Sequence, residues 1–350
     1  MNKPNKLLLI VNLGSPKLPE SKEVGEFLDE FLMDPLVIDI PKPLRWLLVK
    51  KLIVPRRSPE SAKAYSKIWM GQNGSPLVFH TKNMVKEISS ELKNFHVDFA
   101  MRYNGPSLES TLNHYKTFHE IYLLPIYPQY AESSTETVFS EVKRILSKGK
   151  SSPKIFKCDY FYSQPEYLDT LTDHIKKEVE GKNLDHILFS YHGLPERHMK
   201  KLGRTYRKTC LQDNCCPQKF GKEHLCYRAQ CFETTHLVGQ KLKTIKPVTM
   251  STSFQSRLGK AEWIKPYTTS HIEDLVKKQG VKRLGVVCPS FICDCLETLE
   301  EIDMELREQF KELGGEEFHY IPAFNNSESW VKNMSSWVER AHSEWPLINP

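Results

Sequence analysis

Short apolar runs alternate along the chain with longer segments in which apolar residues recur every three or four positions. The short runs are LLLIVNL (7–13), VDFAMRY (97–103), IYLLPIY (121–127), KIFKCDYF (154–161), HILFSYH (186–192), VTMSTSF (248–254), LGVVCPS (284–290) and FHYIPAF (318–324). Their β-branched and aromatic residues favour strands. Helical spacing occurs in longer segments, including 165–180, 227–242 and 296–313. Strands that alternate with helices predict parallel sheets covered by helices on both faces.

The length and an internal similarity indicate two domains. The chain has 350 residues, and a polar connector, KGKSSPK (148–154), lies near its middle. The passages LLPIYPQYAESSTETVFSEV and GVVCPSFICDCLETLEEI both run from an apolar strand through Pro and an aromatic residue into a helix start. We therefore expect an α/β protein with two similar Rossmann-like domains, 1–150 and 151–325, and a C-terminal helix over 326–350. Ligands of such sheets bind beyond the carboxyl ends of the strands.

Composition and the first residues bear on the compartment. Hydrophobic residues make up 39% and charged residues 26%, which is typical of a globular protein with ample core. No uncharged apolar run reaches the roughly 18 residues of a membrane-spanning helix. The opening MNKPNKLLLIVNLGSP leads directly into a Gly turn, which favours a first strand over a signal peptide. We expect a cytoplasmic protein, in which cysteines stay reduced.

A basic segment stands out within a net charge of only +6. PKPLRWLLVKKLIVPRR (41–57) carries six Lys or Arg and no acid, interleaved with Leu, Trp, Val and Ile. One interpretation is a surface helix whose Leu44, Leu48 and Leu52 face the core. The other is a lip, 36–57, whose basic amphipathic part rests peripherally on the anionic inner face of a membrane. Nucleic acid is not an expected partner, because no other segment resembles a nucleic-acid-reading module.

Two loops carry candidate chemistry at predicted strand ends. His192 follows HILFSY and precedes Gly-Leu-Pro, which would hold it on a rigid turn. Asp294, Glu297, Glu300 and Glu301 begin a helix, where capping is the ordinary role of carboxylates. Because Glu297 and Glu301 are four apart, they share a face that could also pass a divalent cation and accept protons. Aromatic residues with Lys and Arg at 252–268 and 101–107 suit a flat apolar ligand bearing carboxylates.

Taken together, seven motifs resemble the ferrochelatase family, which inserts ferrous iron into porphyrin at the end of haem synthesis. They are NLGSP (first-strand turn), RRSPESAKAYSKIWMGQNGSPL (lip region), RYNGPS and YPQY (porphyrin loops), SYHGLPERH (catalytic His), SFQSRLGKAEWIKPYT (signature loop) and CDCLETLEEI (acidic helix). They occur in the family's order over essentially the whole chain. The resemblance implies a chelatase-like fold with a four-stranded parallel sheet in each domain.

The resemblance also assigns roles to individual residues. His192 and Glu297 would meet the iron and the pyrrole nitrogens, and Asp294 and Glu301 would continue an acidic path. The residues expected to border the porphyrin are Leu13, Arg102, Tyr103, Tyr130 and Trp263. The chain departs from the family at Cys295, where an auxiliary His is common. That departure leaves the His192–Glu297 pair intact.

The identity of the porphyrin depends on few residues. Relatives that use coproporphyrin III usually have Tyr before the first-strand Gly, and this chain has Leu13 there. The resemblance therefore favours protoporphyrin IX as the substrate and protohaem as the product. Coproporphyrin III, a non-catalytic tetrapyrrole or iron carrier, and insertion of cobalt or nickel remain alternatives.

Five of the nine cysteines lie within 22 residues: Cys210, Cys215, Cys216, Cys226 and Cys231. Reduced, clustered thiols bind metal more often than each other. Four thiolates would suit a structural zinc or a [2Fe–2S] cluster, and the spacing matches neither the usual zinc ribbon nor a plant ferredoxin. A zinc knuckle beside the basic run 197–208 would be the nucleic-acid alternative. Against the family pattern, residues of about 202–231 form an insertion, which implies a relocated [2Fe–2S] site, with Cys215 or Cys216 the expected spare.

Overall fold

The computed structural model describes residues 5–148, 153–202, 210–211, 214–222, 224–243, 248–257, 259 and 261–348. Parts of the connector 148–154, the basic run 197–208, the insertion 202–231 and the loop 252–268 therefore lie outside the described residues. The chain divides into two compact units. One comprises 1–127, 131–160 and 325–350, and the other comprises 128–130 and 161–324.

The first unit is built on a four-stranded parallel sheet of order β2-β1-β3-β4. Its strands are β1 (Lys6–Asn12), β2 (His96–Met101), β3 (Glu120–Pro125) and β4 (Lys154–Lys157). Its helices are α1 (Ser21–Leu32), α2 (Lys42–Leu47), η1 (Leu48–Ile53), α3 (Val54–Ile68), η2 (Gly71–Asn73), α4 (Pro76–Glu91), α5 (Leu108–His114), η3 (Glu132–Glu136), α6 (Thr137–Leu146), α14 (Glu328–Ala341) and η6 (His342–Glu344). Five successive residues of the central strand β1, Leu7 to Val11, are fully buried, as a strand covered on both faces requires.

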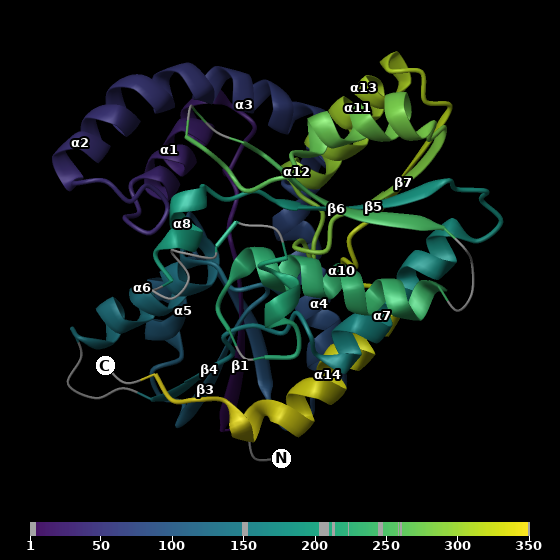
Figure 1. Cartoon of the computed structure of the whole chain (residues 1–350). Helices are drawn as coiled ribbons and strands as arrows, with labels where there is room; N and C mark the ends of the chain where they lie inside the picture. Colours follow the sequence, from purple (N-terminus) through teal and green to yellow (C-terminus); the bar gives the residue numbers. More distant parts are fainter. Residues whose placement is uncertain are drawn as a thin grey trace. The chain divides into compact units, whose positions relative to one another are not determined.

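The second unit repeats this arrangement with the order β6-β5-β7-β8, again all parallel (Figure 1). Its strands are β5 (His186–His192), β6 (Thr249–Gln255), β7 (Arg283–Val287) and β8 (Glu317–Ile321). Its helices are α7 (Pro165–Val179), α8 (Glu196–Lys200), η4 (Pro217–Lys219), α10 (Tyr227–Lys243), α11 (Thr268–Gln279), α12 (Leu296–Thr298), η5 (Leu299–Leu306) and α13 (Arg307–Glu312). The predicted pair of similar α/β domains with four-stranded parallel sheets is confirmed.

The limits of the units follow strand pairing and helix packing. β4 pairs with β3, so the first unit extends beyond residue 150, to residue 160. The C-terminal helix α14 belongs to the same unit, where the indole N–H of Trp330 donates to Sδ of Met84 on α4 at 3.2 Å. Both ends of the chain therefore contribute to the first unit.

The basic segment does not bury its leucines. Leu44 is 59% exposed and Leu52 is 44% exposed, whereas Val49 is fully buried. The interpretation in which Leu44, Leu48 and Leu52 face the core is therefore wrong. The reason is local: residues 48–53 form a π-helix, whose wider turn breaks the four-residue spacing of one face. Arg45 is the other buried residue here, donating to the carbonyls of Ile38 and Ile40 at 3.0 Å.

None of the helices within the described ranges combines the length and the apolar character that crossing a bilayer requires.

Candidate functional site

His192 is the last residue of β5, on the central strand of the second sheet. Its Nδ1 lies 2.6 Å from the carbonyl oxygen of Gly193. Because a carbonyl oxygen only accepts, Nδ1 carries the proton and Nε2 keeps its lone pair in the neutral ring. Gly193 in turn donates its N–H to the carbonyl of Gln255 at 2.8 Å, and a Cβ at this position would lie 2.6 Å from that oxygen. The turn after β5 therefore requires glycine and orients the imidazole.

Glu297 and Glu301 lie on successive helical segments, α12 and the π-helix η5. The Glu301 carboxylate accepts from the backbone N–H of Ser256 at 2.6 Å and from its hydroxyl at 2.5 Å. Burial raises the pKa of Glu301, and the Glu297 carboxylate raises it further. The Ser256 hydrogen bonds and the nearby His192 oppose that rise. Glu301 therefore interacts electrostatically with both His192 and Glu297, and the roles assigned to these three residues stay predictions.

Asp294 is almost completely buried, with 5% of its surface exposed. One carboxylate oxygen accepts from the hydroxyl of Thr298 at 2.9 Å, from the phenol of Tyr320 and from the N–H of Ala323 at 3.3 Å. The N-cap of α12 is Cys295, so these contacts of Asp294 differ from the capping that is the ordinary role of an acid at a helix start. They tie the beginning of α12 to the end of β8.

Cys295 occupies the N-cap of α12. Its backbone N–H donates to the Thr298 hydroxyl at 3.0 Å, which completes a capping box. Burial first, and then the Glu297 carboxylate, raises the pKa of the Cys295 thiol well above its usual value. The Cys295 side chain is therefore a neutral thiol.

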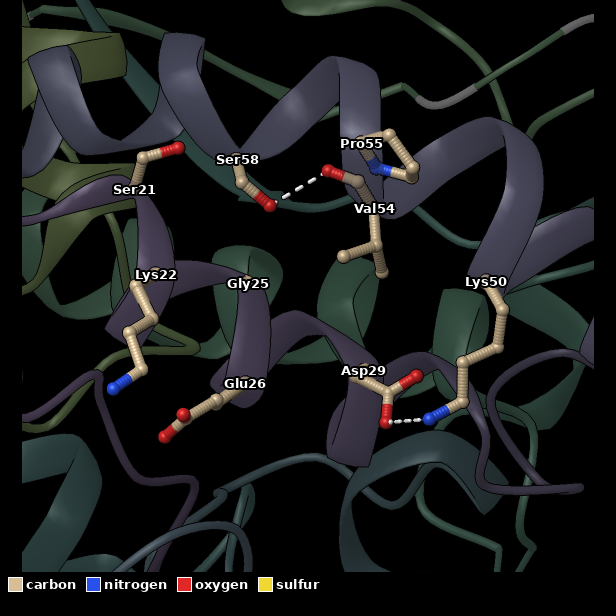
Figure 2. Close-up of a pocket in the computed structure, with 9 residues that line it drawn as sticks. All are labelled: Ser21, Lys22, Gly25, Glu26, Asp29, Lys50, Val54, Pro55 and Ser58. Carbon is tan, nitrogen blue, oxygen red and sulfur yellow. Dashed lines mark hydrogen bonds and ion pairs between the residues drawn. The ribbon is translucent and has the colours of Figure 1, made fainter.

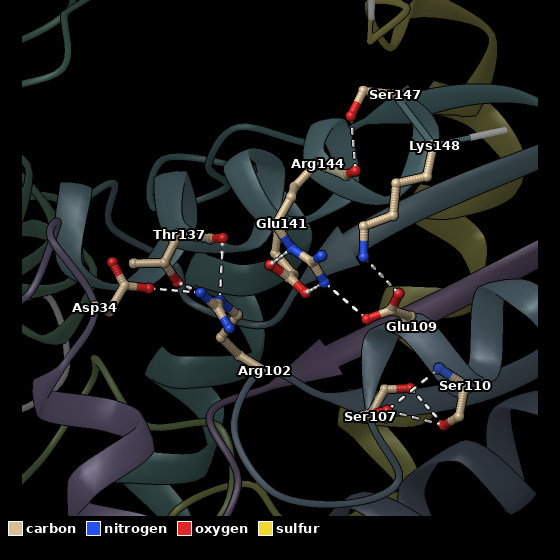
Figure 3. Close-up of polar contacts among 10 residues, drawn as sticks. All are labelled: Asp34, Arg102, Ser107, Glu109, Ser110, Thr137, Glu141, Arg144, Ser147 and Lys148. Atoms are coloured by element: carbon tan, nitrogen blue, oxygen red, sulfur yellow. Dashed lines mark hydrogen bonds and ion pairs between the residues drawn. The ribbon is translucent and has the colours of Figure 1, made fainter.

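In the first unit, Arg102 and Tyr103 follow β2 and both contact Asp34. Figure 3 shows the Arg102–Asp34 pair. Arg102 pairs with the Asp34 carboxylate at 2.5 Å, and the Tyr103 hydroxyl donates to the same oxygen at 3.0 Å. The Arg102 guanidinium also donates to Thr137 and stacks 4.4 Å from the Tyr103 ring centroid. Tyr103 is only 1% exposed, and burial strongly raises its pKa. The cluster holds both predicted porphyrin residues in one conformation.

The other predicted porphyrin residues sit at strand ends or in loops of their own unit. Leu13, half-buried after β1, accepts from Tyr103 through its carbonyl at 2.9 Å. Tyr130 lies in the second unit, where its N–H donates to the Gln230 side chain at 2.7 Å. Trp263 is buried and pairs with Pro195 in an isolated bridge beside the His192 turn. Trp263 and His192 therefore belong to neighbouring, directly paired segments.

The family follows from comparison of the whole chain with known proteins. The family model described as Ferrochelatase matches residues 6–342. The chain belongs to the ferrochelatase family. The ferrochelatase of Pseudomonas syringae pv. syringae is 44% identical over 337 residues, covering 95% of this chain and 97% of that protein. The ferrochelatase of Legionella pneumophila is 41% identical over 336 residues, covering 95% and 98%.

A solved structure supports the fold independently of close sequence similarity. SirB from Bacillus subtilis, determined with Fe3+, aligns with a TM-score of 0.52 at 11% identity. The alignment covers 97% of each chain. At that identity the likeness concerns the fold alone, and it agrees with the paired four-stranded sheets of this ferrochelatase-family chain.

The cysteine-rich segment brings thiols into mutual range. Burial, followed by the neighbouring Cys226 and Cys215 thiols, raises the pKa of Cys210 to about 11. Burial raises that of Cys216 to about 12, with the Arg228 cation opposing and the Cys226 and Cys215 thiols adding to the rise. Among the residues that the structure describes, no three His, Cys, Asp or Glu side chains gather in a geometry that would hold a metal ion. The donor chemistry fits a thiolate-bound group, and the described geometry is not that of a formed site.

Cys231 differs from the other four thiols of this segment. It is fully buried on α10, and it influences the pKa values of Tyr167, Tyr191 and Tyr227, all in the core of the second unit. Burial raises its own pKa well above the usual value, while a hydrogen bond with Tyr227 opposes this. Cys231 therefore interacts with the core tyrosines as well as with the other thiols.

A shallow groove of about 440 Å³ lies between α1 and α3 in the first unit (Figure 2). Lys22, Glu26 and Asp29 of α1 line it, and Lys50 pairs with Asp29 across one end at 2.5 Å. The groove contains none of the residues predicted to bind iron or porphyrin, so it is separate from the candidate site.

Sequence reasoning missed the residues that hold the site in place. Ser256 adopts a left-handed backbone with φ 63°, and this conformation lets its N–H and hydroxyl reach the same carboxylate. Gln255 accepts from Gly193 and donates to the Glu297 carbonyl at 2.8 Å. Asp34 pairs with Arg102 from 68 residues away. Long-range pairing of this kind leaves no local signal in the sequence.

Proposed function

We propose that this chain inserts ferrous iron into protoporphyrin IX to give protohaem, the last step of haem biosynthesis. The observation that carries the proposal is the group of His192, Glu297 and Glu301 at the carboxyl edge of the second sheet, in a chain of the ferrochelatase family. An unprotonated imidazole nitrogen beside two carboxylates provides a base, oxygen ligands and an acceptor for protons at one location.

The proposed mechanism assigns proton transfer to these side chains. Porphyrin must lose both pyrrole N–H protons as Fe2+ takes their place. His192 Nε2 accepts a pyrrole proton, since Nδ1 is already occupied by the Gly193 carbonyl. Glu301, whose pKa is raised by burial, takes up a proton more readily than an exposed carboxylate and passes it on. Glu297 is half-buried and offers its oxygens to the incoming iron.

Two features support protoporphyrin IX over coproporphyrin III. Leu13 offers an aliphatic side chain where relatives of the coproporphyrin type have a tyrosine hydroxyl. The exposed Leu44 and Leu47 of α2 suit handling of a poorly water-soluble product.

The Arg102 guanidinium already binds Asp34 and Thr137, so we assign it to shaping the porphyrin wall.

The test is anaerobic haem formation from the purified chain, ferrous iron and protoporphyrin IX, with coproporphyrin III in parallel. We expect protohaem as the favoured product. His192→Ala should lower kcat at least about a hundredfold, the usual weight of a general base. His236→Ala, an exposed histidine on α10, is the matched control. Haem formation by His192→Ala at the wild-type rate would exclude the assigned role, and faster use of coproporphyrin III would reverse the substrate choice.

We also infer a resident [2Fe–2S] cluster on four thiols of the cysteine-rich segment. Four of Cys210, Cys215, Cys216, Cys226 and Cys231 would be the ligands. The Cys226 and Cys215 thiols raise the pKa of Cys210 and of Cys216, and the Cys226 and Cys216 thiols raise that of Cys231. The guanidinium of Arg228 donates to Cys216 Sγ at 2.9 Å, which suits a thiolate. Zinc on the same thiols is the alternative.

A peripheral membrane contact through residues 41–57 completes the proposal and places the chain in the cytoplasm beside the inner face of the membrane. Leu44, Trp46 and Leu47 are 59%, 46% and 52% exposed, an unusual concentration for one short helix. The Lys51 ammonium lies 5.6 Å from the ring centroid of Trp46, and anionic lipid attracts such a cation.

A further inference from the structure

The first turn of α10 touches both the cysteine-rich segment and the loops around His192. Its first residue, Tyr227, directly follows Cys226. Arg228 comes next. The contacts of this turn that carry the argument below all lie within the second unit. The turn therefore stands between the thiols and the candidate catalytic residues.

Tyr227 fixes the backbone of His192. Its hydroxyl donates to the His192 carbonyl at 2.8 Å and lies 3.2 Å from the hydroxyl of Ser290. Tyr227 is only 5% exposed, and burial strongly raises its pKa, so the phenol remains a donor. Since the His192 side chain is oriented through the adjacent Gly193 carbonyl, a shift of this backbone would move the imidazole.

Arg228 joins the thiols to the loop that carries Trp263. Its Nη1 donates to Cys216 Sγ at 2.9 Å. Its Nε and Nη2 both donate to the carbonyl of Lys265, at 3.2 and 3.0 Å. Its guanidinium also lies 4.6 Å from the ring centroid of Phe232. The planar fork therefore has one arm on the thiol segment and two on the Trp263 loop.

The Trp263 loop is itself joined to the His192 turn. The N–H of Glu196 donates to the Glu262 carbonyl, and the N–H of Ile264 donates to the Leu194 carbonyl, each at 2.9 Å. A displacement at Lys265 would therefore act on the segment that follows His192 as well as on Trp263.

We propose that the first turn of α10 couples the state of the Cys216 thiol to porphyrin binding: Arg228 positions the Trp263 loop only while Cys216 holds it, and Tyr227 positions His192. Cys216 and Cys226 flank this turn in the structure, so metal-bound thiolates and bare thiols would present Arg228 with different acceptors. The inference rests on the proposed function. It makes Arg228 and Tyr227 positioning residues for a regulated porphyrin site.

The test is a double-mutant cycle on protoporphyrin IX affinity, measured without iron by quenching of porphyrin fluorescence. Arg228→Lys keeps the charge but cannot span both partners, and it should raise the dissociation constant at least about fivefold, the ordinary size of such a coupling. Cys216→Ala should do the same. The double variant should be no worse than the weaker-binding single variant. Effects that multiply, or an unchanged affinity in either single variant, would overturn the coupling.

Tyr227→Phe tests the contact between Tyr227 and His192 separately from the contacts of Arg228. It removes only the hydroxyl that holds the His192 carbonyl, so kcat should fall while KM for the porphyrin stays the same. Arg228→Lys should instead act mainly on KM. An equal effect of both variants on both constants would reduce the turn to a general structural role. Lys241→Ala, on the exposed end of α10, controls for changes in helix stability.

These measurements separate the coupling from the proposed function. Porphyrin binding is read without metal insertion, so a wild-type chain that binds porphyrin but forms no haem contradicts the function and leaves the cycle interpretable. A wild-type chain that forms haem while the cycle shows independent effects retains the function and loses the coupling. Thermal unfolding of each variant identifies a variant that lost affinity by losing its fold.

Discussion

At the scale of single residues, surroundings rather than residue type decide what an acid in the segment 294–301 does. Asp294 spends its carboxylate on Thr298, Tyr320 and Ala323, all of them local structural partners. Glu301 accepts from Ser256 yet keeps a raised pKa because it is buried beside another carboxylate. Both residues are carboxylic acids, and their different hydrogen-bond partners give them different proposed roles.

Asp294→Asn tests whether this acid only holds α12 to β8 or also carries protons. An amide oxygen is a weaker acceptor than the carboxylate oxygen for all three donors, so we expect a loss of about 2 kcal/mol in the free energy of unfolding. At a temperature where the variant is folded, kcat should be unchanged. Asp303→Asn, in a partly exposed pair with Arg307, should cost less than about 1 kcal/mol. A loss of turnover without a loss of stability would place Asp294 on the acidic path.

His186 should make the stability of the second unit depend on pH. Its two ring nitrogens lie 2.7 Å from the hydroxyls of Thr249 and Ser251, and Ser251 lies 2.8 Å from His271 Nε2. Burial, and then the nearby His271, lowers the pKa of His186 from 6.5 to about 4. Because the unfolded chain binds the proton more readily, the stability is fully present above pH 6.5 and is lost as pH falls toward 4.

The size of that effect is bounded by the pKa difference, and we expect a loss of up to about 3 kcal/mol across this interval. Denaturant titrations at several pH values measure it. His186→Gln should flatten the pH dependence, and His236→Gln, on the exposed face of α10, should leave it unaltered. An equally steep pH dependence in His186→Gln would assign the effect to other groups.

At the scale of elements, three segments of five to eight residues are π-helices: η1, η3 and η5. Two of them carry proposed functions, η1 in the basic segment and η5 at Glu301. A π-helix has more residues in each turn than an α-helix, so its side chains point in different directions from those of the flanking α-helix. The spacing of apolar residues in an α-helix therefore does not predict which side chains are buried in a π-helix.

The basic segment offers a direct test at this scale. Leu44→Ser with Leu47→Ser should weaken binding to vesicles containing phosphatidylglycerol by about tenfold or more, because each exposed leucine loses apolar transfer energy. Stability should change by less than about 0.5 kcal/mol, since neither side chain packs in the core. Leu347→Ser, also in the first unit and 44% exposed, is the matched control. Vesicle binding unaffected by the leucine pair, or absent in wild type, would contradict the membrane contact.

The sequence predicted the strands well because each is a short apolar run bounded by polar residues. LLLIVNL and HILFSYH correspond to β1 and β5 within one residue, and both are central strands buried on two faces. The Leu44, Leu48 and Leu52 stripe failed for the opposite reason, since its spacing presumes an α-helix where η1 is a π-helix. Ser256 and Asp34 could not be found, because each acts on a partner more than 40 residues distant.

At the scale of the whole molecule, two units of the same strand order carry different side chains at their strand ends. The first ends its strands in the Asp34–Arg102–Tyr103 cluster, whose groups are paired internally. The second ends its strands in the His192 turn and the acidic helices, and it alone contains the cysteine-rich segment. The residues proposed for proton and iron chemistry, His192, Glu297 and Glu301, therefore all belong to the second unit.

The inferred cluster in the second unit predicts the colour and the metal content of the purified protein. Protein purified without oxygen should be brown, contain iron and inorganic sulfide in about equal amounts, near two irons per chain, and bleach with dithionite. One zinc per chain in a colourless protein would replace the cluster with a structural metal. A protein that contains neither iron nor zinc would contradict both assignments.

Removal of the metal should then act on one unit only. Binding to the folded thiols stabilises the structure that holds them, so loss of metal should speed hydrogen exchange in α10 and in the Trp263 loop. β1, buried at the centre of the first unit, should exchange at its original rate. Faster exchange in β1 and α10 alike would mean that the two units unfold together, and the thiols would then stabilise the whole chain rather than the catalytic half.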